Sequence, residues 1–173
     1  MLKPDVRLTR KEQKDLAKAD KARRKENTKR FKADMKRPHI QVDTVNKLFK
    51  VNVADVYEYG QLLDYDIYQD IDGLQKGSLG KAVVGGLLFG AAGAVVGGLA
   101  TKRQKFKVNT FVVRIKVDTN EKYLLSIGDY QLMVNLLPPF LSKEKTQAEI
   151  DSMGEMANNL IEVLDAIKAE ANE

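Results

Sequence analysis

Cysteine and tryptophan are absent from this 173-residue chain, and histidine occurs once, at His39. Without cysteine the chain has no disulfide framework, no thiolate ligand for zinc and no thiol nucleophile, which agrees with a reducing compartment. His39 follows Pro38 at the start of an expected strand, so we interpret it as structural. A metal site built from nitrogen and sulfur ligands is therefore excluded.

Signals of catalysis are also missing. Asp64, Asp66, Asp70 and Asp72 form a group of carboxylates, but neither the spacing of an EF-hand nor a partner base accompanies them. We interpret them as solvated acids near a turn. No serine lies in a nucleophile-elbow sequence. The sequence therefore predicts a protein that is not an enzyme and that needs no cofactor or metal.

Charge is distributed unevenly along the chain. Residues 1–37 hold fifteen lysines and arginines against six acids, a net charge of +9, whereas residues 38–173 hold 14 against 18, a net charge of −4. A basic arm of this kind suits a polyanionic surface, either phospholipid headgroups or nucleic acid, and it can also be a solvated tail. The candidate contact residues are Arg23, Arg24, Lys25, Lys29 and Arg30.

The basic arm is expected to be a helix. Thr9 and Glu12 have the spacing of a capping box, and helix-forming residues continue from Arg10 to about Met35, before Pro38 stops them. The apolar residues of the arm are too few and too scattered to make a continuous buried stripe. We therefore treat residues 1–37 as a helical arm outside the core.

Strand patterns fill residues 38–141. Ile40–Val42 and Leu48–Val51 flank a turn that contains Asp and Asn, and together they predict a hairpin. Aromatic and β-branched residues follow the hairpin, and Phe111–Val117 alternates apolar and polar side chains, as a strand with one buried face does. Tyr123–Ile127 is expected to return as the hairpin partner of that strand. The sheet should therefore resume after the interruption described below.

A last helix is predicted within residues 142–173, from a cap at Ser142 or Thr146 to about Glu170. Its apolar positions recur at intervals of three and four residues, which makes a heptad seam. The seam predicts either a helix that covers the sheet or a short coiled coil with another copy, although three heptads are near the lower limit for a coiled coil. The seam residues are Ile150, Met153, Leu160, Leu164 and Ile167.

The stretch Ala82–Ala100 contains nineteen residues without charge, six of them glycine. Small residues recur every four positions, so one face of a helix would be nearly bare backbone and open to close approach by another helix. In water each interior glycine disfavours a helix by about 1 kcal/mol, so packing or lipid must offset the loss. A flexible loop is the alternative, but the segment is uniformly apolar. The candidate contact residues of this glycine zipper are Gly86, Phe89, Gly90, Gly93, Ala94, Gly97 and Gly98.

Length alone allows Ala82–Ala100 to cross a bilayer, because a helix of this length reaches roughly 28 Å. A single crossing would place the strands before and after it on opposite sides of the membrane, where they could not pair. If the sheet is continuous, the insertion 77–101 leaves and returns on one side as a helical hairpin, with arms of roughly ten residues. We expect this hairpin to dip into a membrane or to pack in an oligomer.

Basic residues flank the insertion, among them Lys102 and Arg103. Such residues favour the anionic cytoplasmic leaflet, although they also act as solubilising gatekeepers around an apolar run. The N-terminus lacks the charged-then-apolar order of a secretory signal peptide. The expected location is therefore cytoplasmic, at the inner face of the cell membrane if the insertion enters lipid.

The run Leu62-Leu-Asp-Tyr-Asp-Ile67, followed by the glycine zipper of residues 75–98, resembles a group of proteins of Gram-positive bacteria and their prophages. These look like small pleckstrin-homology-like (PH-like), or GRAM-like, β-domains interrupted by a glycine zipper, and the resemblance covers roughly Ile40–Ile167. It implies a bent antiparallel sheet capped by the C-terminal helix. It supplies no catalytic residues, and the basic N-terminal helix lies outside it.

The expected fold class is α+β: a small bent antiparallel sheet with an inserted zipper hairpin, a long C-terminal amphipathic helix and a basic N-terminal helix. Two classes of function suit it. In the first, a non-enzymatic, membrane-associated or self-assembling protein inserts or oligomerises through the zipper, and its β-domain binds lipid or protein. In the second, the basic arm binds nucleic acid or a host-factor protein, and the zipper forms only an oligomer core.

Both classes predict a homo-oligomer. The arm offers one aromatic residue, Phe31, for base stacking, and its six acids dilute any binding of phosphates. The first class is therefore favoured.

Overall fold

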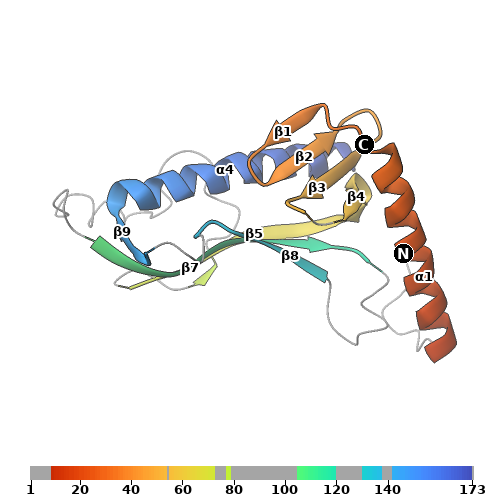
Figure 1. Ribbon diagram of the computed structural model, residues 1–173, viewed down its shortest axis with the longest axis horizontal. Helices are drawn as coiled ribbons and strands as arrows, with labels where there is room; N and C mark the ends of the chain where they lie inside the picture. The colour runs from red at the N-terminus through yellow and green to blue at the C-terminus, as the bar shows by residue number, and fades with distance from the viewer. Residues whose placement is uncertain are drawn as a thin grey trace.

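The computed structural model describes residues 9–53, 55–72, 77–78, 105–119, 130–137 and 142–172. The zipper Ala82–Ala100, its flanking Lys102 and Arg103, and the expected strand Tyr123–Ile127 lie outside the described residues. The elements in chain order are α1 (Arg10–Arg30), β1 (Met35–Arg37), β2 (Ile40–Asp43), β3 (Leu48–Val51), β4 (Val56–Glu58), the 3-10 helix η1 (Tyr59–Gln61), β5 (Leu62–Ile71), β6 (Gly77–Ser78), β7 (Lys105–Val117), β8 (Tyr130–Asn135), β9 (Glu144–Thr146) and α4 (Gln147–Glu170) (Figure 1).

The N-terminal helix α1 begins as predicted but ends earlier. The backbone N–H of Glu12 donates to the Thr9 hydroxyl over 3.3 Å, and the backbone N–H of Thr9 donates to the Glu12 carboxylate over 2.7 Å, so the capping box is confirmed. Phe31 leaves helical geometry with φ −61° and ψ 119°. Met35 pairs with Val42 as part of a strand. The predicted end of the helix at Met35 is therefore wrong.

The side chain of Asp43 explains why the helix stops early. This carboxylate is 1% exposed and accepts the backbone N–H groups of Lys32 over 2.7 Å and of Asn46 over 2.9 Å. Burial raises the pKa of Asp43, but the hydrogen bonds from Asn46 and Lys32 outweigh burial and hold the pKa below its ordinary value. The chain after α1 is thus tied to the turn between β2 and β3. These tertiary hydrogen bonds override the helix propensity of residues 31–35.

The first sheet has the strand order β1-β2-β3-β4, with antiparallel neighbours. β2 and β3 form the predicted hairpin, with Ile40 opposite Val51. The turn between β1 and β2 places His39 at φ 67°, a left-handed backbone conformation, with its Nδ1 3.0 Å from the side-chain oxygen of Asn52. This turn contact supports the interpretation of His39 as structural.

The second sheet joins strands from both sides of the insertion, in the order β6-β5-β7-β8. β5 and β7 pair directly and antiparallel, from Leu62 opposite Val117 to Ile71 opposite Val108. The prediction that the sheet resumes after the interruption is confirmed. The partner on the other edge of β7 is β8, a strand that the sequence did not predict.

Side chains from both sheets and from α4 form one hydrophobic cluster. Phe111, Val113, Ile115 and Val117 of β7 are each 0% exposed, which confirms the predicted buried face of that strand. The described residues thus form helices packed on antiparallel sheets. The predicted α+β class is confirmed.

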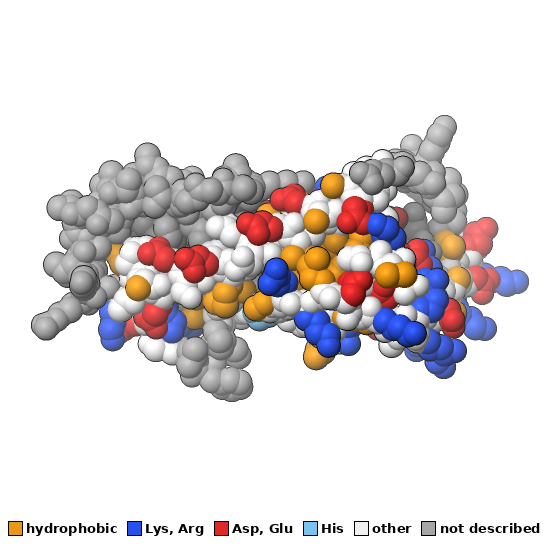
Figure 2. Space-filling view, turned by 90° about the horizontal axis from the view of Figure 1, so that it is seen from above, with side chains coloured by type: hydrophobic (Ala, Val, Ile, Leu, Met, Phe, Trp, Pro, Cys, Tyr) orange, Lys and Arg blue, Asp and Glu red, His pale blue; other side chains and the backbone are white. Residues whose placement is uncertain are grey.

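Helix α4 covers the core side of β5 and β7 (Figure 1). It is capped by Thr146, whose hydroxyl accepts the backbone N–H of Glu149, so Thr146 serves as the cap rather than Ser142. On the outer side of α4, acidic side chains predominate, while basic side chains gather at the α1 end of the molecule (Figure 2). The seam residues belong to the core of their own chain and are between 0% and 5% exposed: Ile150, Met153, Leu160, Leu164 and Ile167.

Replacing Asp43 by asparagine should destabilise the fold by about 1–3 kcal/mol, because it removes the charge that the Lys32 and Asn46 donors face. The folded-state pKa of Asp43 is lowered, so its contribution is present above the unfolded-state pKa and is lost as the pH falls through the folded-state value. Urea unfolding at neutral and at acidic pH measures this. The deficit of the variant should shrink at acidic pH.

The control for this experiment is Asp15→Asn, which removes a carboxylate from the exposed surface of α1. Its unfolding midpoint should match that of the wild type. A deficit of Asp43→Asn that is equal at both pH values would contradict the proposed role of the charge.

Candidate functional site

The insertion root is the place where the chain leaves the second sheet and returns to it; it comprises Asp72, β6 and residues 105–107 of β7. The backbone N–H of Asp72 donates to the carbonyl of Lys107 over 2.9 Å. On the other edge of β5, β6 pairs with Ser78 opposite Tyr68. Only β5 separates the departing strand from the returning one. Residues 79–104 therefore connect two points of one sheet.

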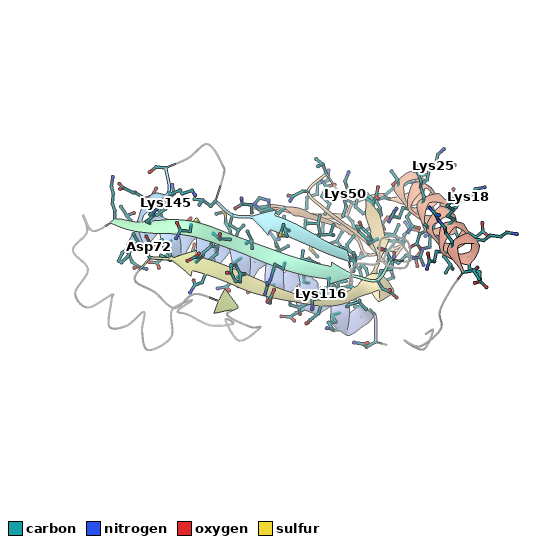
Figure 3. The ribbon with its side chains drawn as sticks, turned by 90° about the horizontal axis from the view of Figure 1, so that it is seen from below. Lys18, Lys25, Lys50, Asp72, Lys116 and Lys145 are labelled. Carbon is teal, nitrogen blue, oxygen red and sulfur yellow. The ribbon has the colours of Figure 1, made fainter. Side chains whose placement is uncertain are left out.

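Lysine side chains surround the insertion root. Lys105, Lys107 and Lys143 are exposed. Lys145 is 8% exposed, and its Nζ lies 3.3 Å from the Glu149 carboxylate. This ion pair links β9 to α4 at the end of the molecule where Figure 3 labels Lys145 and Asp72. The exposed lysines, of which Lys105 lies 4.0 Å from the Glu144 carboxylate, make a cationic rim beside the insertion root.

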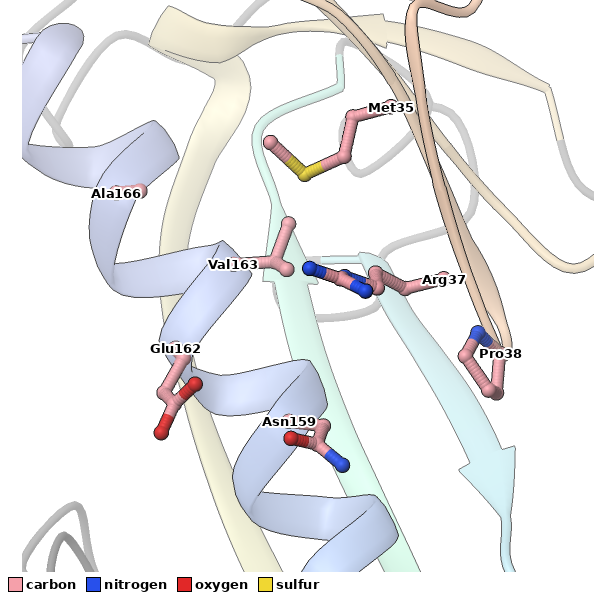
Figure 4. Close-up of a pocket in the computed structure, with 7 residues that line it drawn as sticks. All are labelled: Met35, Arg37, Pro38, Asn159, Glu162, Val163 and Ala166. Carbon is pink, nitrogen blue, oxygen red and sulfur yellow. The ribbon is translucent and has the colours of Figure 1, made fainter.

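A groove of about 370 Å³ lies between β1 and α4 (Figure 4). Met35 and Arg37 reach from the β1 side toward Val163 of α4. The volume is in the range of small-ligand pockets, and the apolar part of the lining suits an acyl chain or an apolar side chain. The lining residues are Met35, Arg37, Pro38, Asn159, Glu162, Val163 and Ala166.

The face of β5 and β7 opposite α4 is polar. The Nε of Arg114 donates to Asp66 over 2.8 Å, which raises the pKa of Arg114, and the guanidinium lies 5.0 Å from the centre of the Tyr68 ring. Asp72 accepts a hydrogen bond from the Asn109 side chain over 2.8 Å. These acids thus have separate partners, and no group of acids or histidine among the described residues could hold a metal ion.

Comparison with known proteins decides the family. The model of a family described as "Glycine zipper containing PH domain" matches residues 24–128, more than half of the chain. The chain belongs to this family. No curated protein and no solved structure matches it. The family match confirms the expected combination of a PH-like domain with a glycine zipper. PH-like domains generally act as interaction modules that bind lipids or proteins.

Helix α1, in which the family match begins, docks on the PH-like domain through polar side chains. The Nε of Arg24 lies 3.0 Å from the Asp55 carboxylate, and the Asn27 side chain donates to Glu58 over 3.3 Å. Asp20 and Asn27 are 2% and 1% exposed. The Arg24 side chain, predicted to contact a polyanion, is 8% exposed and instead helps to hold the helix on the sheet.

The other predicted basic residues of α1 keep contact with solvent. Arg23 pairs with Asp20 over 2.8 Å, yet its side chain is 41% exposed. Lys25, Lys29 and Arg30 are exposed. The structure therefore divides the predicted set into a docking residue and a solvent-facing group.

Replacing Arg24 by alanine should loosen α1 from β4, because it removes the ion pair with Asp55. Asp55 is 57% exposed, so we expect a modest loss of about 1 kcal/mol. Hydrogen exchange of the α1 amides measures the loosening, which should raise their exchange rates several-fold. Lys25→Ala, which removes the adjacent cation on the exposed face, is the matched control. Equal acceleration in both variants would contradict the docking role of Arg24.

Proposed function

We propose that this protein is a non-enzymatic, membrane-associated or self-assembling interaction protein. In this proposal the zipper Ala82–Ala100 inserts into lipid or packs against other copies, and the PH-like domain binds lipid or protein. Membership of the zipper-containing PH family supports the combination. The observation that carries the proposal is the pairing of β5 with β7, which puts both ends of the insertion in one sheet.

The insertion root supports a hairpin over a single membrane crossing. A crossing would separate Ser78 from Lys105 by a hydrocarbon layer of about 30 Å, whereas both of their strands border β5, and neighbouring strands lie about 5 Å apart. Two helical arms of about ten residues would each reach about 15 Å, half of the layer. None of the helices in the described residues has the length and apolarity of a transmembrane span, and the zipper lies outside those residues.

The cationic rim supports contact between the root and an anionic surface. Lys105, Lys107 and Lys143 are exposed where the insertion departs, and Lys102 and Arg103 precede β7 in the sequence. Each lysine or arginine close to an anionic leaflet contributes about 1 kcal/mol. We infer that these residues hold the root at the cytoplasmic face of the membrane while the zipper arms enter the acyl region.

Self-assembly is assigned to the zipper rather than to α4. The α4 seam is buried in the core of its own chain, so it offers no apolar surface to a second chain. In the zipper, Gly86 and Gly90 of the first arm, and Gly93 and Gly97 of the second, would each leave one helix face nearly without side chains. Close backbone packing on such a face is a main source of helix association in lipid. The groove between β1 and α4 is the surface that we assign to a lipid or protein partner of the PH-like domain.

Enlarging the zipper face should reduce assembly. Gly90→Leu and Gly93→Leu each place a large side chain where close helix packing needs bare backbone. Val95→Leu, which enlarges a side chain on the opposite helix face, is the matched control. We expect the wild type and the control to pellet with membranes and to elute from gel filtration in detergent as an oligomer, and the glycine variants to elute later.

One result would contradict membrane association, and another would contradict assembly through the zipper. A wild-type protein that stays in the supernatant while a control membrane protein pellets has no membrane association. Glycine variants with unchanged size in gel filtration would show that the zipper does not drive assembly.

A further inference from the structure

The exposed face of α1 carries a row of lysines, which we call the lysine stripe. The row runs over 19 residues from first to last, roughly 27 Å along the helix axis. Intervals of three and four residues place its members on one side of the helix, and all are exposed. Figure 3 shows Lys18 and Lys25 projecting from α1. The stripe consists of Lys11, Lys14, Lys18, Lys21, Lys25 and Lys29.

The acids of α1 lie off this stripe. Glu12 belongs to the capping box, where hydrogen bonds with Thr9 lower its pKa. Asp20 is 2% exposed on the docked side of the helix. Asp15 and Glu26 fall on the flank at helical spacing, and only Glu26 contacts the stripe, 3.4 Å from the Nζ at its C-terminal end. The acids of α1 therefore lie beside the stripe or on the docked side of the helix, and none interrupts the row of lysines.

The docking contacts of α1 fix the direction of the stripe. Arg24 and Asn27 bind Asp55 and Glu58 on the first sheet, and by helical geometry Lys18 lies on the other side of the helix. The stripe is thus turned away from the sheets and presented as a straight row.

The position of α1 disfavours a membrane as the partner of the stripe. α1 and the insertion root lie at opposite ends of the molecule (Figure 1). The 24-residue helix α4, roughly 36 Å long, runs between these ends, whereas charges are screened over about 8 Å at physiological ionic strength. The residues of α1 that are buried are all polar or charged, so the helix also lacks the apolar face of an interfacial helix.

We propose that the lysine stripe binds the phosphate backbone of double-stranded nucleic acid without reading its sequence. At 3.4 Å per base pair, the stripe runs past about eight base pairs. Lysine acts as a point charge for phosphate rather than as a bidentate reader of base edges. The stripe also contains no aromatic side chain that could stack on unpaired bases. These features together fit a duplex backbone.

The acidic outer side of α4 on a second copy is a weaker partner for the stripe. Exposed ion pairs between side chains contribute about 0–1 kcal/mol each. A duplex offers a dense row of phosphates, and the release of condensed counterions drives the binding of cations to it. Added salt should therefore weaken the complex steeply.

Fluorescence anisotropy with short labelled DNA duplexes tests the proposal, using the full-length protein in nonionic detergent. The wild type should bind duplexes of unrelated sequence equally, and the logarithm of affinity should fall against the logarithm of salt concentration with a slope of about −3. The stripe variant Lys14→Gln/Lys18→Gln/Lys25→Gln should lose about tenfold or more in affinity and show a slope flattened by about 2.

The matched control, Lys32→Gln/Lys50→Gln/Lys116→Gln, removes the same charge from sites outside α1 and should retain most of the affinity. Equal losses in the two triple variants would overturn the proposal, because net charge rather than the stripe would then govern binding. Binding that does not weaken with salt would overturn it as well.

Phosphatidylserine vesicles serve as the second probe. Stripe-dependent binding to vesicles without binding to duplexes would assign the stripe to lipid and overturn the proposal. Gly90→Leu keeps the stripe intact, so its duplex binding should equal that of the wild type. This variant separates a failure of the stripe from a failure of the zipper.

Discussion

From Leu62 to Ile71, β5 runs in antiparallel register with β7, a strand that follows β6 only after residues 79–104 have intervened. This pairing joins the parts of the second sheet that come before and after the insertion, and it places the inner faces of both strands against α4. It also fixes the insertion root, where Asp72 is bonded to the Lys107 backbone. The insertion therefore begins and ends in one sheet, and in the proposed function the zipper meets lipid or protein without changing the core.

The packing of the core and of α4 depends on the β5–β7 pairing. Residues such as Ile67 and Val113 face α4 and are at most 1% exposed, and each buried side chain of this size contributes about 1.5–3 kcal/mol. The α4 seam packs against them and is used entirely within the chain. The opposite face of the same strands is polar and carries the ion pair between Arg114 and Asp66. One face of the sheet is therefore buried in the hydrophobic core, and the other face carries charged side chains.

Much of the fold was predictable from the sequence, because the relevant signals are local. The capping box at Thr9, the β2–β3 hairpin and the alternation along β7 follow from spacing alone. The end of α1 was not predictable, since it depends on Asp43, a residue distant in sequence from the helix. The docking of α1 was also missed, because its buried residues are polar and hydrophobic periodicity does not detect them. One signal was present: Asp20, Arg24 and Asn27 recur at intervals of four and three.

The two candidate contact regions lie at opposite ends of the molecule, with the insertion root at one end and α1 at the other (Figure 1). In the proposed function, β5 stays paired with β7 while the zipper is inserted or assembled. The natural absence of cysteine allows a direct measurement with Asp70→Cys/Thr110→Cys, whose Cα atoms are opposite each other in the β5–β7 register. We expect oxidation to join the two strands fully in the membrane-bound or assembled fraction, and to leave the distant pair Asp70→Cys/Lys116→Cys unjoined. A disulfide that forms in the free protein but not in that fraction would contradict this expectation.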